Sequence, residues 1–412
     1  MKFDKYHIAS AIKANLARQG FKRPTDIQYK AIPPILNGED VLAVAQTGTG
    51  KTAAFAIPVI DRIAKLKRSR KTRGIRCLVM VPTRELAVQI NTVFCQLAGN
   101  TRVKSLAVYG GVEQDAQIDR LIKGVDVLVA TPGRMFDLIS QGVVSLDRLE
   151  TLVLDEADQM LDLGFINDIK AIKKKLKTRH QTLFFSATIN KQIKKLAFSQ
   201  VRSNAIRIQV SPDDPVSKNV SHSVAFVRMD DKRFFLRRFI KAYPKERILV
   251  FVRTRVRAER VFKALERSGI RSQTLHGEKD QAERESVLAV FKKGDCRVLI
   301  ATDVSARGID IPNVSFVINY DLPDQAETYV HRVGRTGRGR QKGSALSFCS
   351  QRERPLLEAI QQLLPYPISE IAISKNEYAD TLVLEEGQQD LRAMILEHEA
   401  RGKKGRKRKG RS

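Results

Sequence analysis

The chain has 412 residues, too many for one compact domain and suited to two α/β domains of roughly 200 residues each with a tail. No apolar run is long enough to span a bilayer and no charged-then-apolar leader follows Met1, so we expect a soluble cytoplasmic protein without membrane contacts. Lys and Arg exceed Asp and Glu by 28, and this excess predicts a polyanionic partner, namely nucleic acid.

Six short apolar runs alternate with helical stretches through the first half of the chain. Runs that are apolar on both faces are typical of buried parallel strands whose connections are helices. The runs span residues 41–45, 77–81, 106–109, 125–130, 151–154 and 182–186. They predict one parallel sheet wrapped by helices.

A second series of apolar runs predicts a second sheet. Helical segments such as 255–268 and 280–293 separate these runs, which span 248–252, 297–301, 315–319 and 345–348. Residues 211–221 lie between the two series and contain two prolines, two aspartates and little apolar content. This composition suits an exposed linker, so we expect a hinge there.

The chain ends in a strongly basic segment. Residues 401–412 contain eight Lys or Arg and no acid, so this segment cannot bury a core and is expected to be disordered. It leaves 28 − 8 = +20 for the rest of the chain. Two interpretations stay open: the tail tethers the protein to nucleic acid through salt-sensitive contacts, or it only improves solubility.

The run at 41–45 leads into AQTGTGKT, residues 45–52, and then into an apolar helix. This order predicts a phosphate-binding loop, in which backbone amides and the helix N-terminus face the phosphates. Lys51 would add charge at the β- and γ-phosphates, and Thr52 would be a ligand of Mg²⁺. Ala45 replaces the first glycine of the GxxxxGK[ST] pattern, and a glycine-rich turn followed by a chance Lys-Thr pair is the alternative.

The run at 151–154 ends in the tetrapeptide DEAD, residues 155–158. Its carboxylates are expected at the carboxyl edge of the sheet, where open α/β folds bind ligands. Asp155 is predicted to hold Mg²⁺ through its water shell, and Glu156 to orient and deprotonate an attacking water. For the tetrapeptide alone, a helix start that favours acids is the alternative.

Further motifs surround these two across about residues 3–350. They are GFKRPTDIQ (20–28), PTRELA (82–87), GG (110–111), TPGR (131–134), SAT (186–188), VFVRT (250–254), ATDVSARGID (301–310) and HRVGRTGR (331–338). In order and spacing, the complete set resembles the DEAD-box RNA helicases, which are driven by ATP.

This resemblance implies an α/β fold of two tandem RecA-like domains, each a mostly parallel sheet flanked by helices, joined by a flexible linker. The expected boundaries are 1–210 for the ATP-binding domain, 211–221 for the linker, 222–372 for the second domain and 373–412 for a C-terminal extension with the basic tail.

The resemblance also implies ATP and Mg²⁺ as cofactors. Phe21 would stack on adenine and Gln28 would hydrogen-bond its edge, because an amide can donate and accept at once. The other implied ATP contacts are Phe3, Ala45, Gln46, Thr47, Gly48, Thr49, Gly50, Gly308 and Asp310. A turn with a helix cap is the alternative for the PTxxQ pattern around Gln28.

Loop residues of both domains resemble the RNA track of the family. They offer amides, hydroxyls and guanidinium groups to phosphates and 2′-hydroxyls, so binding should be largely independent of sequence. TPGR alone could be an ordinary turn. The implied residues are Pro82, Thr83, Arg84, Gly111, Thr131, Pro132, Gly133, Arg134, Arg253, Thr254, Gly277, Thr302 and Asp303.

The motif HRVGRTGR predicts a catalytic site that is shared between the two domains. Arg335 and Arg338 resemble arginine fingers that reach the γ-phosphate bound to the other domain, so hydrolysis would require closure. They complete a predicted catalytic set with Lys51, Asp155 and Glu156. By the same resemblance, His331 contacts the first domain near Ser186 and Thr188. An arginine-rich loop that only binds RNA or solvent is the alternative.

Three classes of function follow. We favour an RNA-dependent ATPase that locally unwinds short duplexes or strips proteins from RNA. A non-enzymatic RNA clamp would need a degraded catalytic set, and a DNA helicase is disfavoured because PTRELA, TPGR and Gln28 follow the RNA-acting pattern. The short basic tail resembles bacterial members that assist ribosome assembly or mRNA decay, which makes ribosomal or RNA-decay proteins candidate partners of a monomer.

Overall fold

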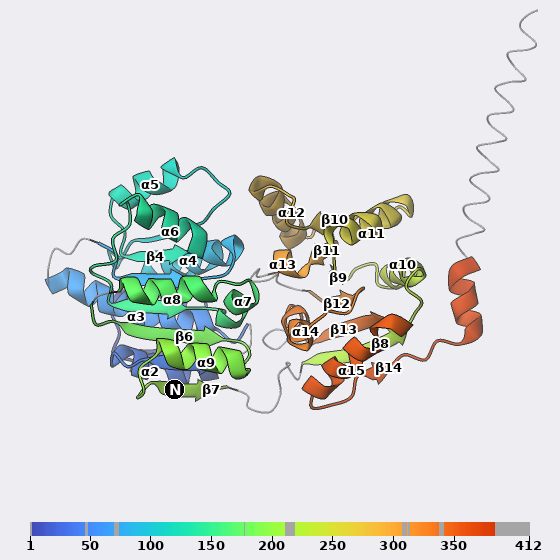
Figure 1. Ribbon diagram of the computed structural model, residues 1–412, viewed down its shortest axis with the longest axis horizontal. Coiled ribbons are helices and arrows are strands. Elements are labelled where there is room, and N and C mark those ends of the chain that lie inside the picture. The colour runs from blue at the N-terminus through green and yellow to red at the C-terminus, as the bar shows by residue number, and fades with distance from the viewer. Residues whose placement is uncertain are drawn as a thin grey trace, which may run out of the picture.

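The computed structural model describes residues 2–45, 48–69, 74–176, 178–210, 219–306, 311, 314–337 and 342–383. These residues form two α/β domains that lie side by side, each with a central sheet between helices (Figure 1). Every strand pair described in the two sheets is parallel. The predicted fold class is confirmed.

The first sheet has the spatial order β3-β4-β2-β5-β6-β1-β7. Its strands are β1 (Val41–Val44), β2 (Cys77–Met80), β3 (Ser105–Val108), β4 (Val127–Ala130), β5 (Thr151–Leu154), β6 (Gln181–Ser186) and β7 (Ile206–Gln209). All six apolar runs of the first half form strands. The edge strand β7 was missed because only one of its four residues is buried, so it carries no apolar run.

Helices cover both faces of the first sheet. They are η1 (Phe3–Lys5), α1 (Ser10–Arg18), α2 (Asp26–Leu36), α3 (Lys51–Ser69), α4 (Arg84–Ala98), α5 (Asp115–Ile122), α6 (Pro132–Ser140), α7 (Ala157–Asp162), α8 (Ile166–Lys175) and α9 (Lys191–Gln200). The first four α-helices pack on one face and the other five on the opposite face. Strand neighbours such as Leu152 and Val153 join opposite cores because successive side chains alternate across a sheet.

The second sheet has the order β10-β11-β9-β12-β13-β8-β14. Its strands are β8 (Val220–Phe226), β9 (Ile248–Val252), β10 (Gln273–Leu275), β11 (Val298–Thr302), β12 (Phe316–Asn319), β13 (Gly343–Cys349) and β14 (Ser369–Glu370). The four predicted runs form β9, β11, β12 and β13. The other three strands were missed because β10 and β14 are very short and β8 contains polar residues.

The helices of the second domain also cover two faces. They are α10 (Lys232–Ala242), α11 (Arg255–Arg267), α12 (Gln281–Lys293), α13 (Asp303–Ala306), α14 (Ala326–Val333), η2 (Gln351–Glu353) and α15 (Arg354–Leu363). Both α10 and α11 pack on one face, and α12, α14 and α15 pack on the other. Among the helices described in either domain, none has the length and apolar character needed to cross a bilayer.

Two expected boundaries change. β8 begins at Val220, inside the segment 211–221, because this strand pairs with β13 over its whole length; the second sheet therefore starts before residue 222. Residues 375–383 are helical and pack beside α10, where the Tyr378 hydroxyl donates to Asp231 at 2.7 Å (Figure 1). Part of the predicted C-terminal extension thus belongs to the second domain. The basic tail lies outside the described residues.

A buried ion pair connects α10 to the end of the second sheet. The Lys232 side chain is fully buried, and its Nζ donates to Glu353 at 2.5 Å and to the Tyr320 carbonyl at 2.7 Å. Asp321 lies 3.9 Å from the same ammonium group. Burial lowers the pKa of Lys232, and the two carboxylates oppose this change by stabilising its charge. The second domain therefore depends on a matched set of buried charges.

Replacing Lys232 with Met should destabilise the second domain by about 3–5 kcal/mol, because two buried carboxylates lose their cation. Urea unfolding of the full chain measures the change in the free energy of unfolding. Lys241→Met is the matched control, since Lys241 is an exposed lysine of the same helix. Lys232→Met with Glu353→Gln should recover part of the loss. Equal losses of stability in Lys232→Met and Lys241→Met would contradict the role of Lys232 as the cation for the buried carboxylates.

Candidate functional site

The predicted motifs of the first domain meet at one edge of its sheet. β1 leads to the glycine-rich loop, β5 to DEAD and β6 to SAT, and these three strands are neighbours in the order β5-β6-β1. Since parallel strands share one carboxyl edge, their following loops converge there. The topology alone therefore brings Lys51, Asp155 and Ser186 to a common region.

The loop before α3 is shaped for a phosphate group. Gly48 and Gly50 have φ angles of 80° and 92°, which favour glycine, and a Cβ on Gly50 would lie 2.4 Å from Gln28 Nε2. Lys51 is 7% exposed, and its Nζ is buried without a hydrogen-bond partner in the described part of the chain. A buried ammonium group of this kind fits a phosphate ligand.

Two carboxylates follow β5 at the same edge. Asp155 is buried, and burial raises its pKa to about 7, with the Glu156 charge adding to the shift and Lys51 opposing it. Glu156 has a left-handed backbone with φ 51°, and its Oε2 is buried without a hydrogen-bond partner among the described residues. A strained residue with an unsatisfied carboxylate oxygen is typical of a functional site.

These residues fit ATP with Mg²⁺. Lys51 would contact phosphate oxygens, whereas Asp155 and the half-buried Thr52 would hold the metal ion directly or through water. The metal would neutralise charge on the phosphates when bound. The uncompensated burial of Asp155 supports this assignment, because a bound cation would stabilise its ionised form.

The residues predicted to contact adenine lie in the N-terminal segment. Phe21 is half-buried, and the buried Phe3 supports it edge-on at a ring distance of 6.2 Å. Gln28 is 1% exposed; its Oε1 accepts the Thr25 amide at 3.1 Å and its Nε2 donates to the Gly50 carbonyl at 3.1 Å. Gln28 therefore caps α2 and also braces the phosphate loop.

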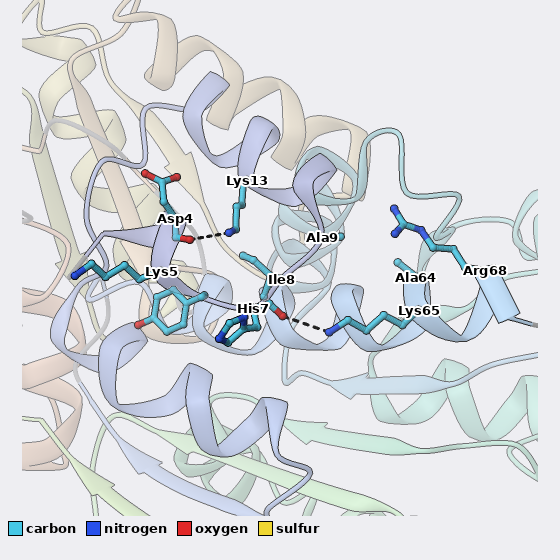
Figure 2. Close-up of a pocket in the computed structure, with 10 residues that line it drawn as sticks. Asp4, Lys5, His7, Ile8, Ala9, Lys13, Ala64, Lys65 and Arg68 are labelled. Atoms are coloured by element: carbon cyan, nitrogen blue, oxygen red, sulfur yellow. Dashed lines mark hydrogen bonds between the residues drawn. The ribbon is translucent and has the colours of Figure 1, made fainter.

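A hollow of about 650 Å³ lies behind this segment, between η1, α1 and α3. Figure 2 shows Lys13 and Lys65 reaching the carbonyl groups of Asp4 and His7 at its rim. The hollow contacts the last two turns of α3, whereas Lys51 begins that helix, roughly 20 Å away. It is therefore separate from the phosphate loop.

Two predicted RNA-binding arginines converge on one loop of the first domain. The Arg84 guanidinium lies so close to Gly111, which has a φ of 77°, that a Cβ there would overlap it. Arg134 donates to the Val112 carbonyl at 2.9 Å. Thr83 and Thr131 precede α4 and α6 as their N-caps, so both helix N-termini lie at this surface. Such termini suit phosphate groups.

In the second domain, the Arg253 amide donates to Asp321 at 3.0 Å, and Thr254 caps α11 by accepting the Arg257 amide at 3.2 Å. Asp303 binds Arg332 through both carboxylate oxygens at 2.5 and 2.7 Å. The Asp303 carboxylate is therefore engaged in structure, so an RNA contact here would involve its backbone. The sequence analysis did not identify the buried Arg332 as the structural partner of Asp303.

Asp158 links the DEAD segment to SAT and to the second domain. Its Oδ2 accepts the Thr188 amide at 2.9 Å and the Thr188 hydroxyl at 3.0 Å, and it lies 3.4 Å from His331 Nε2. Burial raises the pKa of Asp158, but His331, Lys51 and the Thr188 amide outweigh burial and hold it below its usual range. Asp158 thus lies between Thr188 of the SAT loop and His331 of the second domain.

Glu85 and Arg284 form a second contact between the domains. Arg284 of α12 lies 2.5 Å from Glu85 of α4, and their side chains are only 12% and 7% exposed. Sequence reasoning missed this pair. The sequence places Glu85 in the motif PTRELA, but nothing in the sequence links this glutamate to a specific arginine of the other domain.

Several predicted residues fall outside the described part of the chain, namely Gln46, Thr47, Gly308, Asp310 and Arg338. Arg335 is described: it is 3% exposed, and its Nε donates to the His331 carbonyl at 3.2 Å. Arg335 and His331 are therefore positioned together.

Fold and site define a two-domain nucleotide-binding protein. Residues 25–196 match the DEAD/DEAH box helicase model, and residues 231–340 match the helicase conserved C-terminal domain. The chain is 40% identical to the ATP-dependent RNA helicase DeaD of Buchnera aphidicola over 98% of its length and 66% of that protein's length. It is also 40% identical to the ATP-dependent RNA helicase CshA of Listeria monocytogenes, over 88% of its length and 68% of that protein's.

The chain therefore belongs to the DEAD-box family of ATP-dependent RNA helicases. Among solved structures, S. cerevisiae Dbp5 bound to RNA and ADP BeF3 is similar, with a TM-score of 0.82 and 30% identity over 93% of this chain and 99% of that one. This likeness covers both RecA-like domains. The chain spans about two thirds of the length of DeaD.

Breaking the contact between Glu85 and Arg284 should weaken closure. Arg284→Gln leaves the Glu85 carboxylate buried without a cation, so the apparent RNA affinity in ATP turnover should fall roughly tenfold or more. The charge swap Glu85→Arg with Arg284→Glu should restore part of it. Lys292→Gln, at an exposed position of α12, is the matched control. A swap variant no better than Arg284→Gln would argue against direct pairing.

Proposed function

We propose that this protein is an RNA-stimulated ATPase that locally unwinds short RNA duplexes or remodels RNA–protein complexes. The observation that carries the proposal is the contact between Asp158 and His331, because it joins the DEAD segment to the motif that contains the predicted arginine fingers. The hydrolytic site would then be complete only when the domains are closed.

Each predicted catalytic residue has a role in this proposal. Lys51 binds the phosphates, Asp155 holds Mg²⁺, and Glu156 orients the attacking water and accepts its proton. Arg335 and Arg338 stabilise negative charge on the transferred phosphoryl group. Lys51 and Glu156 each have a buried polar atom that forms no hydrogen bond with any described residue. Both atoms could therefore bind a ligand, which supports these roles.

The proposed RNA track crosses both domains. In the first it uses Arg84, Arg134 and the helix N-termini beside them, and in the second it uses the segment at Arg253 and Thr254. Most of these groups would meet phosphates and 2′-hydroxyls, so the protein would read little sequence. ATP and RNA would each stabilise the closed arrangement, and each would therefore strengthen binding of the other by the same factor. A regular duplex would not fit the closed cleft.

The biological setting is proposed from relatives. The two relatives named above are bacterial RNA helicases. We infer a cytoplasmic monomer that acts in ribosome assembly or RNA turnover, with ribosomal or RNA-decay proteins as partners. Sedimentation of cell extracts would test the first association, because a ribosome-assembly factor should comigrate with ribosomal precursor particles.

ATP turnover should rise strongly with single-stranded RNA and fall by 10² or more in Glu156→Gln, because the general base is lost while the fold is retained. Initial rates of phosphate release measure this, with RNA, DNA of the same sequence, or neither. Equal stimulation by DNA would favour the DNA-helicase alternative. Absence of turnover in both proteins, with RNA binding intact, would favour an RNA clamp.

The basic tail is proposed to tether the enzyme to structured RNA. Deleting residues 401–412 removes eight positive charges and should reduce affinity for a structured RNA at low salt, with a smaller effect at high salt. Maximal turnover at saturating single-stranded RNA should not change. Unaltered RNA affinity at low salt would show instead that the tail only aids solubility.

A further inference from the structure

α11 connects the proposed RNA track to the outside of the second domain. Its N-cap is Thr254, which directly follows Arg253 of the track, and the helix then continues for 13 residues, or roughly 18 Å. Arg260, Lys263 and Arg267 are exposed and recur at spacings of three and four residues. They therefore lie along one solvent face of the helix that leads away from the track.

A second row of cations adjoins this face. Arg233, Arg237 and Lys241 recur every four residues along α10, a helix with five basic residues and no acid. Arg237 donates to the Ser268 hydroxyl at the end of α11 at 2.8 Å, so the two rows meet there. We call the six cations Arg233, Arg237, Lys241, Arg260, Lys263 and Arg267 the basic ridge.

Among the described residues, four cations of the basic ridge lack an acidic partner that would explain their charge. Lys241, Arg260, Lys263 and Arg267 form no ion pair with any acid in the described part of the chain. Like charges at these helical spacings repel one another. α11 also contains Glu259 and Glu266, but Glu259 pairs with His276 and neither acid forms an ion pair with these cations in the described residues. The buried cations of the same domain, Lys232 and Arg332, are by contrast matched by carboxylates. The unmatched row therefore suits a ligand that is itself a row of negative charges.

We propose that the basic ridge binds the backbone phosphates of double-stranded RNA that flanks the strand held in the track. This inference rests on the proposed function, because the track at Arg253 and Thr254 supplies the starting point. A single strand that fills only the track would not reach the far end of α11. A duplex continuing from that strand would pass along the helix, and its phosphates would meet Arg260, Lys263 and Arg267 in turn.

The test compares two RNAs and two variants. The RNAs are a ten-nucleotide oligouridine and a hairpin carrying the same ten uridines as a single-stranded extension. The ridge variant is Arg260→Gln, Lys263→Gln, Arg267→Gln. The matched control is Lys170→Gln, Lys174→Gln, Lys175→Gln, which removes three exposed positive charges from α8 of the first domain. Fluorescence anisotropy with a non-hydrolysable ATP analogue gives Kd at several salt concentrations.

The ridge variant should bind the hairpin at least tenfold more weakly and the oligouridine less than twofold more weakly. Its slope of log Kd against log salt for the hairpin should fall by about 2 to 3, since about one phosphate contact is lost per cation. The control should change neither value. Turnover stimulated by oligouridine should stay at the wild-type level in both variants.

Three results would overturn the proposal: equal loss for the two RNAs, equal loss in the control, or no loss at all. Thermal melts of both variants exclude misfolding as the cause of a loss. Failure of the wild-type protein to bind oligouridine would instead overturn the proposed function, so the two failures can be told apart.

Discussion

The proposed site between the two domains depends on the contacts of the Asp158 carboxylate. It is buried at the end of the DEAD segment, holds the SAT loop through Thr188, and faces His331 of the second domain. A buried carboxylate is unfavourable without compensating donors, so separating the domains would expose or unbalance it. The proposed catalytic residue Glu156 is two residues away from Asp158, so binding of a ligand at Glu156 would lie close to the contact with the second domain.

Buried charges near the phosphate loop are arranged differently. Asp158 has several donors, whereas Lys51 and Glu156 keep buried polar atoms that lack hydrogen-bond partners among the described residues. Burial with incomplete pairing costs stability, and a ligand that supplies the missing partner would recover it. The first domain thus keeps its uncompensated polar groups where ATP is proposed to bind.

The sequence predicted the sheets well because buried parallel strands are continuous apolar runs, as in β2, β5 and β9. It failed at β7, β8, β10 and β14, where exposure, polar residues or shortness remove that signal. Site residues within sequence motifs could be named, but their partners could not. The contacts between Glu85 and Arg284 and between Asp303 and Arg332 join residues far apart in sequence, and only the folded chain brings such charges together. Gln28 matches the alternative of a helix cap, since it caps α2 and also contacts Gly50 of the glycine-rich loop, while its contact with adenine stays a prediction.

The net charge of +28 is distributed unevenly between the interior and the surface of the protein. Buried cations such as Lys232 and Arg332 are matched by acids, as a stable core requires. Unmatched cations such as Arg260 and Lys263 lie on the solvent faces of helices, where they repel one another and contribute nothing to packing. Because an unpaired buried cation is unfavourable, cations without a partner are expected at the surface; Lys51, at the proposed ATP site, departs from this rule. The surplus must therefore accumulate at the surface, and its continuity with the segment at Thr254 is what distinguishes α11 from other basic helices such as α8.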